Sequence, residues 1–510
     1  MTSTVDHVHA VPGELEARLA GLLADWLPQQ RWYGGKGARI DADGVRVLAR
    51  LDLLPGREPG LSLVVVEVRP HGRDAERYQL FLGTRRRLPE ALAHAELGFV
   101  DDGHGAKLHC YDALHDPELA GWLLGRLAAG EVIGPLRFHL LPGRRIIKGL
   151  RSLVLTGEQS NTSVIYGDKL IAKFLRRSVP GVNPDLELSL ALADSGCRNI
   201  PQPVGWIDLT LAEDFGAAQA QPQHEEHAAD EPAGHEAGAT TPARPGSYGG
   251  FEFYGGPEPI TVATVSEFLP TATDGWLLAQ TSVRDLYAQP VGTEPKDAGG
   301  DFGPESRRLG KATARVHHDL ATSLPTGRME PEEMARVAAG MIRHLHRAAD
   351  RVTELQPYVP ALRAALAELA HLDKPVQTQR VHGDFHLGQV MRTVHGWVLL
   401  DFEGEPSRSL DERRAMAPAV KDVAGMARSF DYAAHHLGDD PDVAEQWAQR
   451  NFESFCKGYA SVSGHDPREQ EVLLRGYEID KAVYEAVYEA ANRPNWLPIP
   501  LAAVKRLAGR

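Results

Sequence analysis

The chain has 510 residues, of which 43% are hydrophobic, and this is enough for two or three domains with real cores. Its formal net charge of −14 excludes a nucleic-acid-binding protein that works through a basic face. The cysteines lie outside any metal-ligand spacing, and the sequence shows neither a signal-peptide pattern nor an apolar stretch long enough to span a membrane. We therefore expect a cytoplasmic protein that binds neither nucleic acid nor membrane.

Residues 1–95 predict a helix packed on an antiparallel sheet. In residues 12–27, apolar side chains recur at helical spacing, namely Leu15, Leu19, Leu22, Leu23 and Trp26. The pattern stops before Pro28, as helices do. The segments GVRVLARLDLL, LSLVVVEVRP and RYQLFLGT follow, and turn residues separate them, which is typical of strands. We expect a first α+β subdomain without a catalytic set.

Residues 96–268 predict a second unit built mainly from strands. After a helix at 118–130, the segment GLRSLVLTGEQSNTSVIYGDKLIAKFLRR alternates strands with turns, and ITVATVSEFLP predicts a further strand. Between these strands, residues 217–250 are rich in Ala, Gln, Glu, Pro, Gly and His without hydrophobic periodicity. This composition predicts a disordered insertion whose scattered histidines lie in solvent and bind no metal.

Residues 269–510 predict a mainly helical third part. Helical periodicity is clearest at 306–322, 331–351, 359–371 and 469–491. Among these helices stands the segment RVHGDFHLGQVMRTVHGWVLLDFEGEP, residues 380–406, in which two short apolar runs carry polar residues at their ends. This segment is the strongest candidate for a catalytic site.

The spacing of its polar residues is typical of kinases. Asp384 is followed five residues later by Gln389 and then by Asp401, directly before Phe402. Phosphoryl transfer needs a carboxylate that accepts the proton of the acceptor hydroxyl, together with hard oxygen ligands for Mg²⁺. We therefore expect Asp384 to be the catalytic base and Gln389 and Asp401 to bind Mg²⁺, with ATP as the phosphate donor.

A kinase also needs a lysine for the nucleotide phosphates and a helix glutamate that positions it. Lys173 lies on an apolar strand, and fourteen residues later Glu187 lies in the first turns of a helix that Asn183 and Pro184 begin. The order and spacing fit such a pair. We expect Lys173 and Glu187 to act together at the phosphates.

Two further segments are candidates for nucleotide contacts. The polar turn of GEQSNTSVIYG offers hydroxyl and backbone N–H donors for phosphate oxygens at Ser160, Asn161, Thr162 and Ser163. The segment SEFLPTATDGW predicts a hinge in which backbone groups from Glu267 to Leu269 face the adenine edge.

Seven stretches of the sequence resemble those of the actinobacterial maltokinases over nearly the whole chain. They are WLPQQRWYGGKG, GEQSNTSVIYGDKLIAKFLRR, GVNPDLELSLALADSGC, VHGDFHLGQV, LLDFEGEP, DVAGMARSFDYAA and NRPNWLPIP. The resemblance implies an α+β fold, a bilobal protein-kinase-like (aminoglycoside phosphotransferase-like) fold with an N-terminal cap. It also implies that the protein uses ATP and Mg²⁺ to phosphorylate maltose at the anomeric hydroxyl, giving maltose 1-phosphate. This reaction feeds a route from trehalose to α-glucan and glycogen, in association with trehalose synthase.

The helix YEIDKAVYEAVYEA, residues 477–490, is the candidate sugar site. Tyr477, Lys481, Tyr484 and Tyr488 share one face, opposite an apolar face that must be core. We expect Lys481, Tyr484, Glu485 and Tyr488 to line the acceptor cleft beside Asp384, because tyrosine rings stack on sugar C–H faces. In the competing interpretation, the tyrosines only pack against a neighbouring element.

The acceptor, the catalytic competence and the role of Asp422 stay open at the level of the sequence. The related glucosamine kinases share the cap and the core from HGD to DFE, so the acceptor is maltose, glucosamine or another sugar. A protein of another class, a kinase-like scaffold that binds nucleotide without turnover, would keep the same fold. Asp422 either binds the backbone of the catalytic loop or is an ordinary residue on a helix surface.

Overall fold

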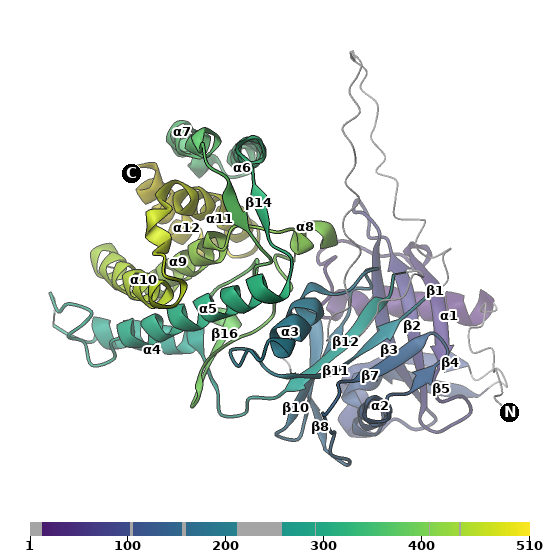
Figure 1. The fold of residues 1–510 in the computed structure, drawn as a ribbon. Helices are drawn as coiled ribbons and strands as arrows, with labels where there is room; N and C mark the ends of the chain where they lie inside the picture. The colour runs from purple at the N-terminus through teal and green to yellow at the C-terminus, as the bar shows by residue number, and fades with distance from the viewer. Residues whose placement is uncertain are drawn as a thin grey trace. The chain divides into compact units, whose positions relative to one another are not determined.

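The structure is a computed structural model that describes residues 13–101, 106–155, 160–211, 258–290, 292–406, 408–437 and 440–509. The chain divides into two compact units (Figure 1). Unit 1 comprises Met1–Asn183 and Pro203–Phe268, and unit 2 comprises Pro184–Gln202 and Leu269–Arg510. The predicted insertion at 217–250 lies outside the described residues. Within the described part of the chain, no helix is both long enough and apolar enough to cross a membrane.

The first sheet of unit 1 is antiparallel, with strand order β1-β2-β3-β5-β4. Its strands are β1 (Val45–Asp52), β2 (Gly60–Val68), β3 (Glu76–Arg85), β4 (Glu96–Asp101) and β5 (Lys107–Asp112). Helix α1 (Gly13–Trp26) packs against β1 and β4. The helix and first three strands match the prediction, whereas β4 and β5 were missed because these short, half-exposed strands carry little apolar alternation.

The second sheet of unit 1 has the order β6-β7-β11-β12-β10-β9-β8, again antiparallel. Its strands are β6 (Val132–Ile133), β7 (Leu136–Leu140), β8 (Ser152–Val154), β9 (Asn161–Tyr166), β10 (Leu170–Leu175), β11 (Pro203–Leu209) and β12 (Ile260–Glu267). Helix α2 (Pro117–Ala129) contacts β7, β8 and β11. This sheet carries the strand of the predicted phosphate-binding lysine.

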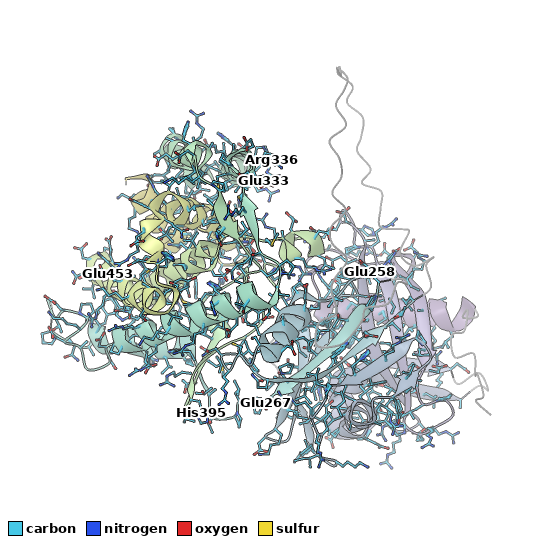
Figure 2. All side chains as sticks on the ribbon, in the orientation of Figure 1. Glu258, Glu267, Glu333, Arg336, His395 and Glu453 are labelled. Carbon is cyan, nitrogen blue, oxygen red and sulfur yellow. The ribbon has the colours of Figure 1, made fainter. Side chains whose placement is uncertain are left out.

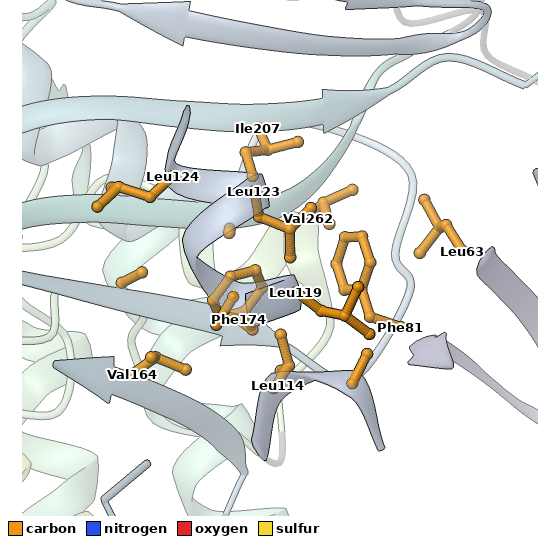
Figure 3. Packing of buried hydrophobic residues seen from close by; sticks show 14 of the residues in the cluster. Leu63, Phe81, Leu114, Leu119, Leu123, Leu124, Val164, Phe174, Ile207 and Val262 are labelled. Carbon is orange, nitrogen blue, oxygen red and sulfur yellow. The ribbon is translucent and has the colours of Figure 1, made fainter. Parts of the chain in front are cut away.

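One hydrophobic core joins the two sheets of unit 1 (Figure 3). Phe81 of β3 meets Phe174 of β10 edge to face, with ring centroids 5.6 Å apart. Polar contacts continue the connection, since the buried Gln79 amide donates to the carbonyls of Leu175 at 2.8 Å and Thr261 at 3.1 Å. The first sheet is therefore part of the same packed body as the strand that carries Lys173.

Unit 2 is mainly helical. Its helices are α3 (Pro184–Asp194), α4 (Gly275–Tyr287), α5 (Gly303–Ser323), α6 (Pro331–Arg351), α7 (Val359–Glu368), α8 (Leu410–Arg414), α9 (Val420–His435), α10 (Pro441–Ser463), α11 (Glu471–Asn492) and α12 (Pro498–Ala508). Two small antiparallel sheets complete it: β13-β16-β17 (Thr273–Asp274, Val390–Thr393, Gly396–Leu399) and β14-β15 (Gly327–Met329, Val376–Thr378).

The helices of unit 2 pack against one another (Figure 1). Helix α9 contacts α4, α10, α11 and α12, while α5 packs along α10. The predicted helices 306–322, 331–351, 359–371 and 469–491 correspond to α5, α6, α7 and α11. The hairpin of β16 and β17 holds the two apolar runs of residues 380–406, so the polar residues at their ends lie at strand termini.

Candidate active site

The loop of residues 382–389 before β16, here named the catalytic loop because it carries the predicted base Asp384, is held in place by one buried carboxylate. Asp422, only 1% exposed at the start of α9, accepts the backbone N–H groups of His382 at 2.8 Å and Gly383 at 2.9 Å. The His317 ring of α5 lies 3.0 Å from the same carboxylate. Burial opposes ionisation of Asp422, but the bond with His317 lowers its pKa below the usual range. Of the two interpretations of Asp422, the structure confirms the one in which it binds the loop backbone.

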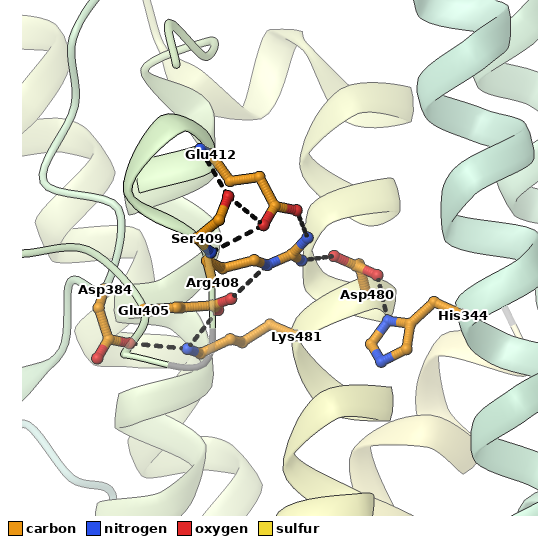
Figure 4. Close-up of polar contacts among 8 residues, drawn as sticks. All are labelled: His344, Asp384, Glu405, Arg408, Ser409, Glu412, Asp480 and Lys481. Atoms are coloured by element: carbon orange, nitrogen blue, oxygen red, sulfur yellow. Dashed lines mark hydrogen bonds and ion pairs between the residues drawn. The ribbon is translucent and has the colours of Figure 1, made fainter. Parts of the chain in front are cut away.

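Asp384 of this loop pairs with a lysine from α11 (Figure 4). The Lys481 ammonium lies 2.9 Å from Asp384 Oδ1 and 3.0 Å from Glu405 Oε1. Burial by itself would raise the pKa of Asp384, but the charge of Lys481 overcomes it and holds the pKa at about 2. Its two carboxylate partners in turn raise the pKa of Lys481, although burial opposes this. Asp384 is therefore an ionised carboxylate near neutral pH, as a base must be.

A chain of alternating charges continues from this pair (Figure 4). Glu405 accepts a bond from Arg408 at 3.2 Å, and Arg408 lies 4.0 Å from Asp480, which bonds to His344 at 2.9 Å. These contacts link the segment after Asp401 to α11 and α6. The network holds the segment that follows Asp401, the second predicted magnesium ligand. It is built from acidic and basic side chains that contact one another in turn.

The two predicted magnesium ligands lie side by side. The Gln389 amide nitrogen donates to Asp401 Oδ2 at 3.2 Å. Among the described residues, Asp401 is the one non-glycine residue with positive φ, at 62°, a strained conformation that commonly occurs at functional sites. The next residue is anchored too, because the Phe402 N–H donates to Asp185 of α3 at 2.8 Å.

This pair fits magnesium. If the Gln389 amide turns over, it presents an oxygen beside the Asp401 carboxylate, and two protein oxygens suffice for a cation that takes its other ligands from water and phosphates. Groups of three or more His, Cys, Asp or Glu side chains that could hold a metal ion do not occur in the described part of the chain. Gln389 and Asp401 stay the predicted ligands.

The two members of the predicted lysine–glutamate pair belong to different units. Lys173 lies on β10 of unit 1, where Ser163 of β9 is its register partner. Glu187 lies on α3 of unit 2, 7% exposed, and bonds to Arg380 at 2.7 Å, with Arg414 at 3.5 Å. Arg380 precedes the catalytic loop and was not recognised from the sequence.

The remaining residues that were predicted to contact the nucleotide lie in unit 1, except for Leu269. Ser160 is exposed at the end of the turn, but Asn161, Thr162 and Ser163 are buried and belong to β9, not to the turn as expected. Thr162 accepts a bond from the buried Arg176 at 2.8 Å. The rest of the turn, residues 156–159, lies outside the described residues.

The predicted hinge coincides with a boundary between the units. Glu267 ends β12 in unit 1 (Figure 2) and has an ion pair with Arg144 at 3.3 Å. Leu269 begins the second stretch of unit 2, so the chain passes from one unit to the other between Phe268 and Leu269. The backbone there connects two packed bodies, and the adenine contact stays a prediction.

The predicted sugar-binding face lies on α11. The Tyr484 and Tyr488 rings stack with centroids 6.5 Å apart, and the Lys481 ammonium lies 5.1 Å from the Tyr484 centroid. Tyr488 is 39% exposed. The opposite face is core, with Ile479 fully buried. Lys481 therefore contacts both the Tyr484 ring and the Asp384 carboxylate.

Glu485 is engaged differently. Its carboxylate accepts two bonds from the buried Arg428 of α9, at 2.9 and 2.8 Å. Burial raises its pKa despite this arginine. Arg428 also pairs with Asp431 at 2.5 Å, and Asp431 binds Arg506. Neither Arg428 nor Glu405 was recognised from the sequence. Glu405 stands inside the motif LLDFEGEP and Arg428 inside DVAGMARSFDYAA, so both could have been found there.

Two protein families match the chain. The maltokinase N-terminal cap domain matches residues 26–116, and the phosphotransferase enzyme family matches residues 283–465. Among curated proteins, a glucosamine kinase of Streptacidiphilus jiangxiensis is 27% identical over 383 residues, covering 70% of this chain and 73% of that protein. A glucosamine kinase of Mycolicibacterium smegmatis is 26% identical over 365 residues, covering 69% and 78%.

Solved structures show a similar fold. A glucosamine kinase in complex with glucosamine, ADP and inorganic phosphate aligns with a TM-score of 0.61 at 23% identity, over 97% of this chain and 99% of that one. A second crystal form of glucosamine kinase gives 0.62 at 24%, over 91% and 94%. These matches confirm the predicted aminoglycoside phosphotransferase-like, kinase-like fold, with a maltokinase-type cap at its N-terminal side. The matched domains support a kinase-type phosphotransferase and leave the acceptor sugar open.

Proposed function

We propose that this protein is an ATP- and magnesium-dependent sugar kinase that phosphorylates maltose at the anomeric hydroxyl. The observation that carries the proposal is Asp384, a carboxylate that Lys481 keeps ionised, on a loop that also leads to the adjacent Gln389 and Asp401 side chains. This set contains a base and the oxygen donors that phosphoryl transfer to an alcohol requires.

The reaction follows from these roles. The sugar oxygen forms a bond to the γ-phosphorus of ATP as its proton passes to Asp384, and the bond from that phosphorus to the β-phosphate oxygen breaks, which releases ADP. Magnesium, held by Gln389 and Asp401, would supply charge neutralisation at the phosphates. Asp422 keeps the loop in place through its bonds to backbone N–H groups, and Lys481 orients the Asp384 carboxylate.

A neutral sugar such as maltose would leave the ion pairs around Lys481 as they are. Lys481 is shared by Asp384 and Glu405, and Arg408 contacts Glu405 and, at 4.0 Å, Asp480. An acceptor that carries an ammonium group would instead take one of these carboxylates from its present cation. The match to a maltokinase-type cap agrees with this choice. The maltokinase resemblance also implies a place between trehalose and α-glucan and a complex with trehalose synthase.

Glucosamine is the second candidate. The two curated proteins reported above are named glucosamine kinase, at 27% and 26% identity. For glucosamine to bind, one carboxylate of the network would have to exchange its present partner for the sugar ammonium. Glu405 is the candidate, because Lys481 contacts it together with Asp384.

A screen of ADP formation tests the proposal. The purified full chain is supplied with ATP, Mg²⁺ and one acceptor at a time, namely maltose, glucosamine, glucose, trehalose or choline, and the Asp384→Asn variant serves as control. We expect turnover with maltose that requires Mg²⁺ and falls by about 10²–10⁴ in the variant. Turnover with glucosamine alone would show that the acceptor is glucosamine and not maltose, while the type of reaction would be the proposed one. ATP binding without turnover of any acceptor would instead identify a catalytically silent nucleotide-binding protein and refute the proposal.

A further inference from the structure

An open pocket of about 510 Å³ lies on unit 2 between α5 and α10. It is lined by Gly303, Pro304, Arg307, Arg308, Lys311, Arg450, Ser454 and Lys457. Five of these eight residues are basic and none is acidic. Such a concentration of positive charge is unusual in a chain whose net charge is −14. The pocket shares no residue with the Asp384 site.

Two glycines bring the walls of this pocket together. A Cβ atom on Gly310 of α5 would lie 2.0 Å from the Phe455 carbonyl oxygen of α10, and one on Gly458 of α10 would lie 2.0 Å from the Arg307 carbonyl oxygen. The two helices therefore pack backbone against backbone at this crossing. Because the helices are so close, the long basic side chains that flank the glycines converge on one pocket.

Three of the five cations have carboxylate partners. Arg308 pairs with Glu305 at 2.6 Å, Arg450 with Asp301 at 2.6 Å, and Lys457 with Glu453 at 3.6 Å. All three carboxylates lie outside the pocket lining. These pairs are contacts that helix surfaces and helix ends commonly make, and they explain three of the five charges.

Arg307 and Lys311 are different. Within the described residues, neither side chain has a carboxylate within 4.0 Å, yet they stand four residues apart on the same face of α5. Like charges at this spacing destabilise a helix. The partial positive charge of the α5 N-terminus, at Gly303 and Pro304 of the same pocket, adds to their repulsion. An anion bound in the pocket would relieve it.

We propose that this pocket binds a phosphorylated small molecule. The Arg307 guanidinium suits bidentate binding of phosphate oxygens, Lys311 supplies a compact charge, and the Ser454 hydroxyl offers a further donor. The volume lies in the range typical of small-ligand sites. The strongly negative net charge disfavours nucleic acid as the occupant. The site would therefore take a phosphate ester of the size of a sugar phosphate.

Calorimetric titration of glucose 6-phosphate, with inorganic phosphate and a short DNA duplex as further probes, tests the proposal on the full chain in low-salt buffer. The informative variant is Arg307→Gln/Lys311→Gln. Its matched control is Arg343→Gln/Arg347→Gln, which removes the same charge at the same spacing from exposed positions of α6. Thermal unfolding of both variants checks that they are folded.

We expect the parent chain to bind glucose 6-phosphate, and the affinity to fall by about tenfold or more in Arg307→Gln/Lys311→Gln but not in the control. Weaker binding of inorganic phosphate than of glucose 6-phosphate would show that the pocket uses the sugar as well. Equal affinity in the parent and the α5 variant would place the anion elsewhere and overturn the proposal. Binding of the DNA duplex in place of glucose 6-phosphate, lost in the α5 variant, would also overturn it.

Discussion

Asp384, the predicted base, stabilises the fold at neutral pH while Lys481 is beside it. Replacing Lys481 by methionine should turn this stabilisation into destabilisation. In the parent chain, Lys481 holds the pKa of Asp384 at about 2, against an ordinary value of 3.8, although the carboxyl group is largely buried. At about 1.36 kcal/mol per pH unit, this difference corresponds to about 2 kcal/mol of stabilisation at neutral pH. The stabilisation is complete above pH 4 and is lost as the pH falls from 4 to 2, because the folded-state pKa is the lower one. Without Lys481, burial would raise the pKa of Asp384 above 3.8, and the ionised group would destabilise the fold at neutral pH.

A double-mutant cycle measures this coupling. Urea unfolding at neutral pH gives the effect of Asp384→Asn in the parent chain and in the Lys481→Met background. We expect the substitution to destabilise the parent and to be neutral or stabilising in the background, with a coupling of about 2 kcal/mol. The control pair is Arg343→Met with Asp384→Asn, which should show no coupling, because Arg343 is exposed on α6. Equal destabilisation by Asp384→Asn with and without Lys481 would refute the reasoning.

Four substitutions test the predicted roles of individual site residues. Asp384→Asn should lower turnover by about 10²–10⁴ and keep ATP binding, since an amide cannot accept the hydroxyl proton; near-normal rates would remove Asp384 from this role. Asp401→Asn should raise the Mg²⁺ concentration needed for half-maximal rate, and an unchanged requirement would exclude it as a ligand. Asp422→Asn leaves one backbone N–H of the catalytic loop facing an amide NH₂, which should cost about 1–3 kcal/mol in urea unfolding. Tyr484→Ala should raise the KM for sugar about tenfold, or about 1.4 kcal/mol, and leave the KM for ATP unchanged; equal increases would assign the ring a structural role.

Much of the fold could be predicted because its signals are local. The helix at 331–351 has the bounds of α6, since a proline at its start and an amphipathic pattern define it without reference to the rest of the chain. The two apolar runs between Asp384 and Asp401 were likewise visible in the sequence, and the structure pairs them as β16 and β17. The short strands β4 and β5 were missed because their residues alternate weakly and because the pairing of β5 with β3, and of β4 with β5, depends on tertiary contacts.

The ion pairs of the site could not be predicted, because their partners lie far apart in the sequence. Lys481 and Asp384 are separated by 97 residues, and Arg380 and Glu187 by 193. Charge and spacing in the sequence do not encode which cation meets which carboxylate. The burial of Asp422 could not be predicted either. Its sequence context fitted both a position on a helix surface and the buried position that it has in the structure.

Helix α11 shows how one helix face can serve two purposes. The sequence placed Lys481 and Glu485 one turn apart and predicted that both would bind sugar. In the structure, Lys481 reaches the catalytic loop, whereas Glu485 is held by Arg428 of α9. An ionised carboxylate as buried as Glu485 needs such a cation, so its first function is to pair with the arginine, which itself would be costly to bury alone. Lys481 instead lies between Asp384 and Glu405 and contacts both carboxylates. The predicted base therefore depends on α11 through Lys481, and the Tyr484 and Tyr488 rings of the same helix stay the predicted contacts of the sugar.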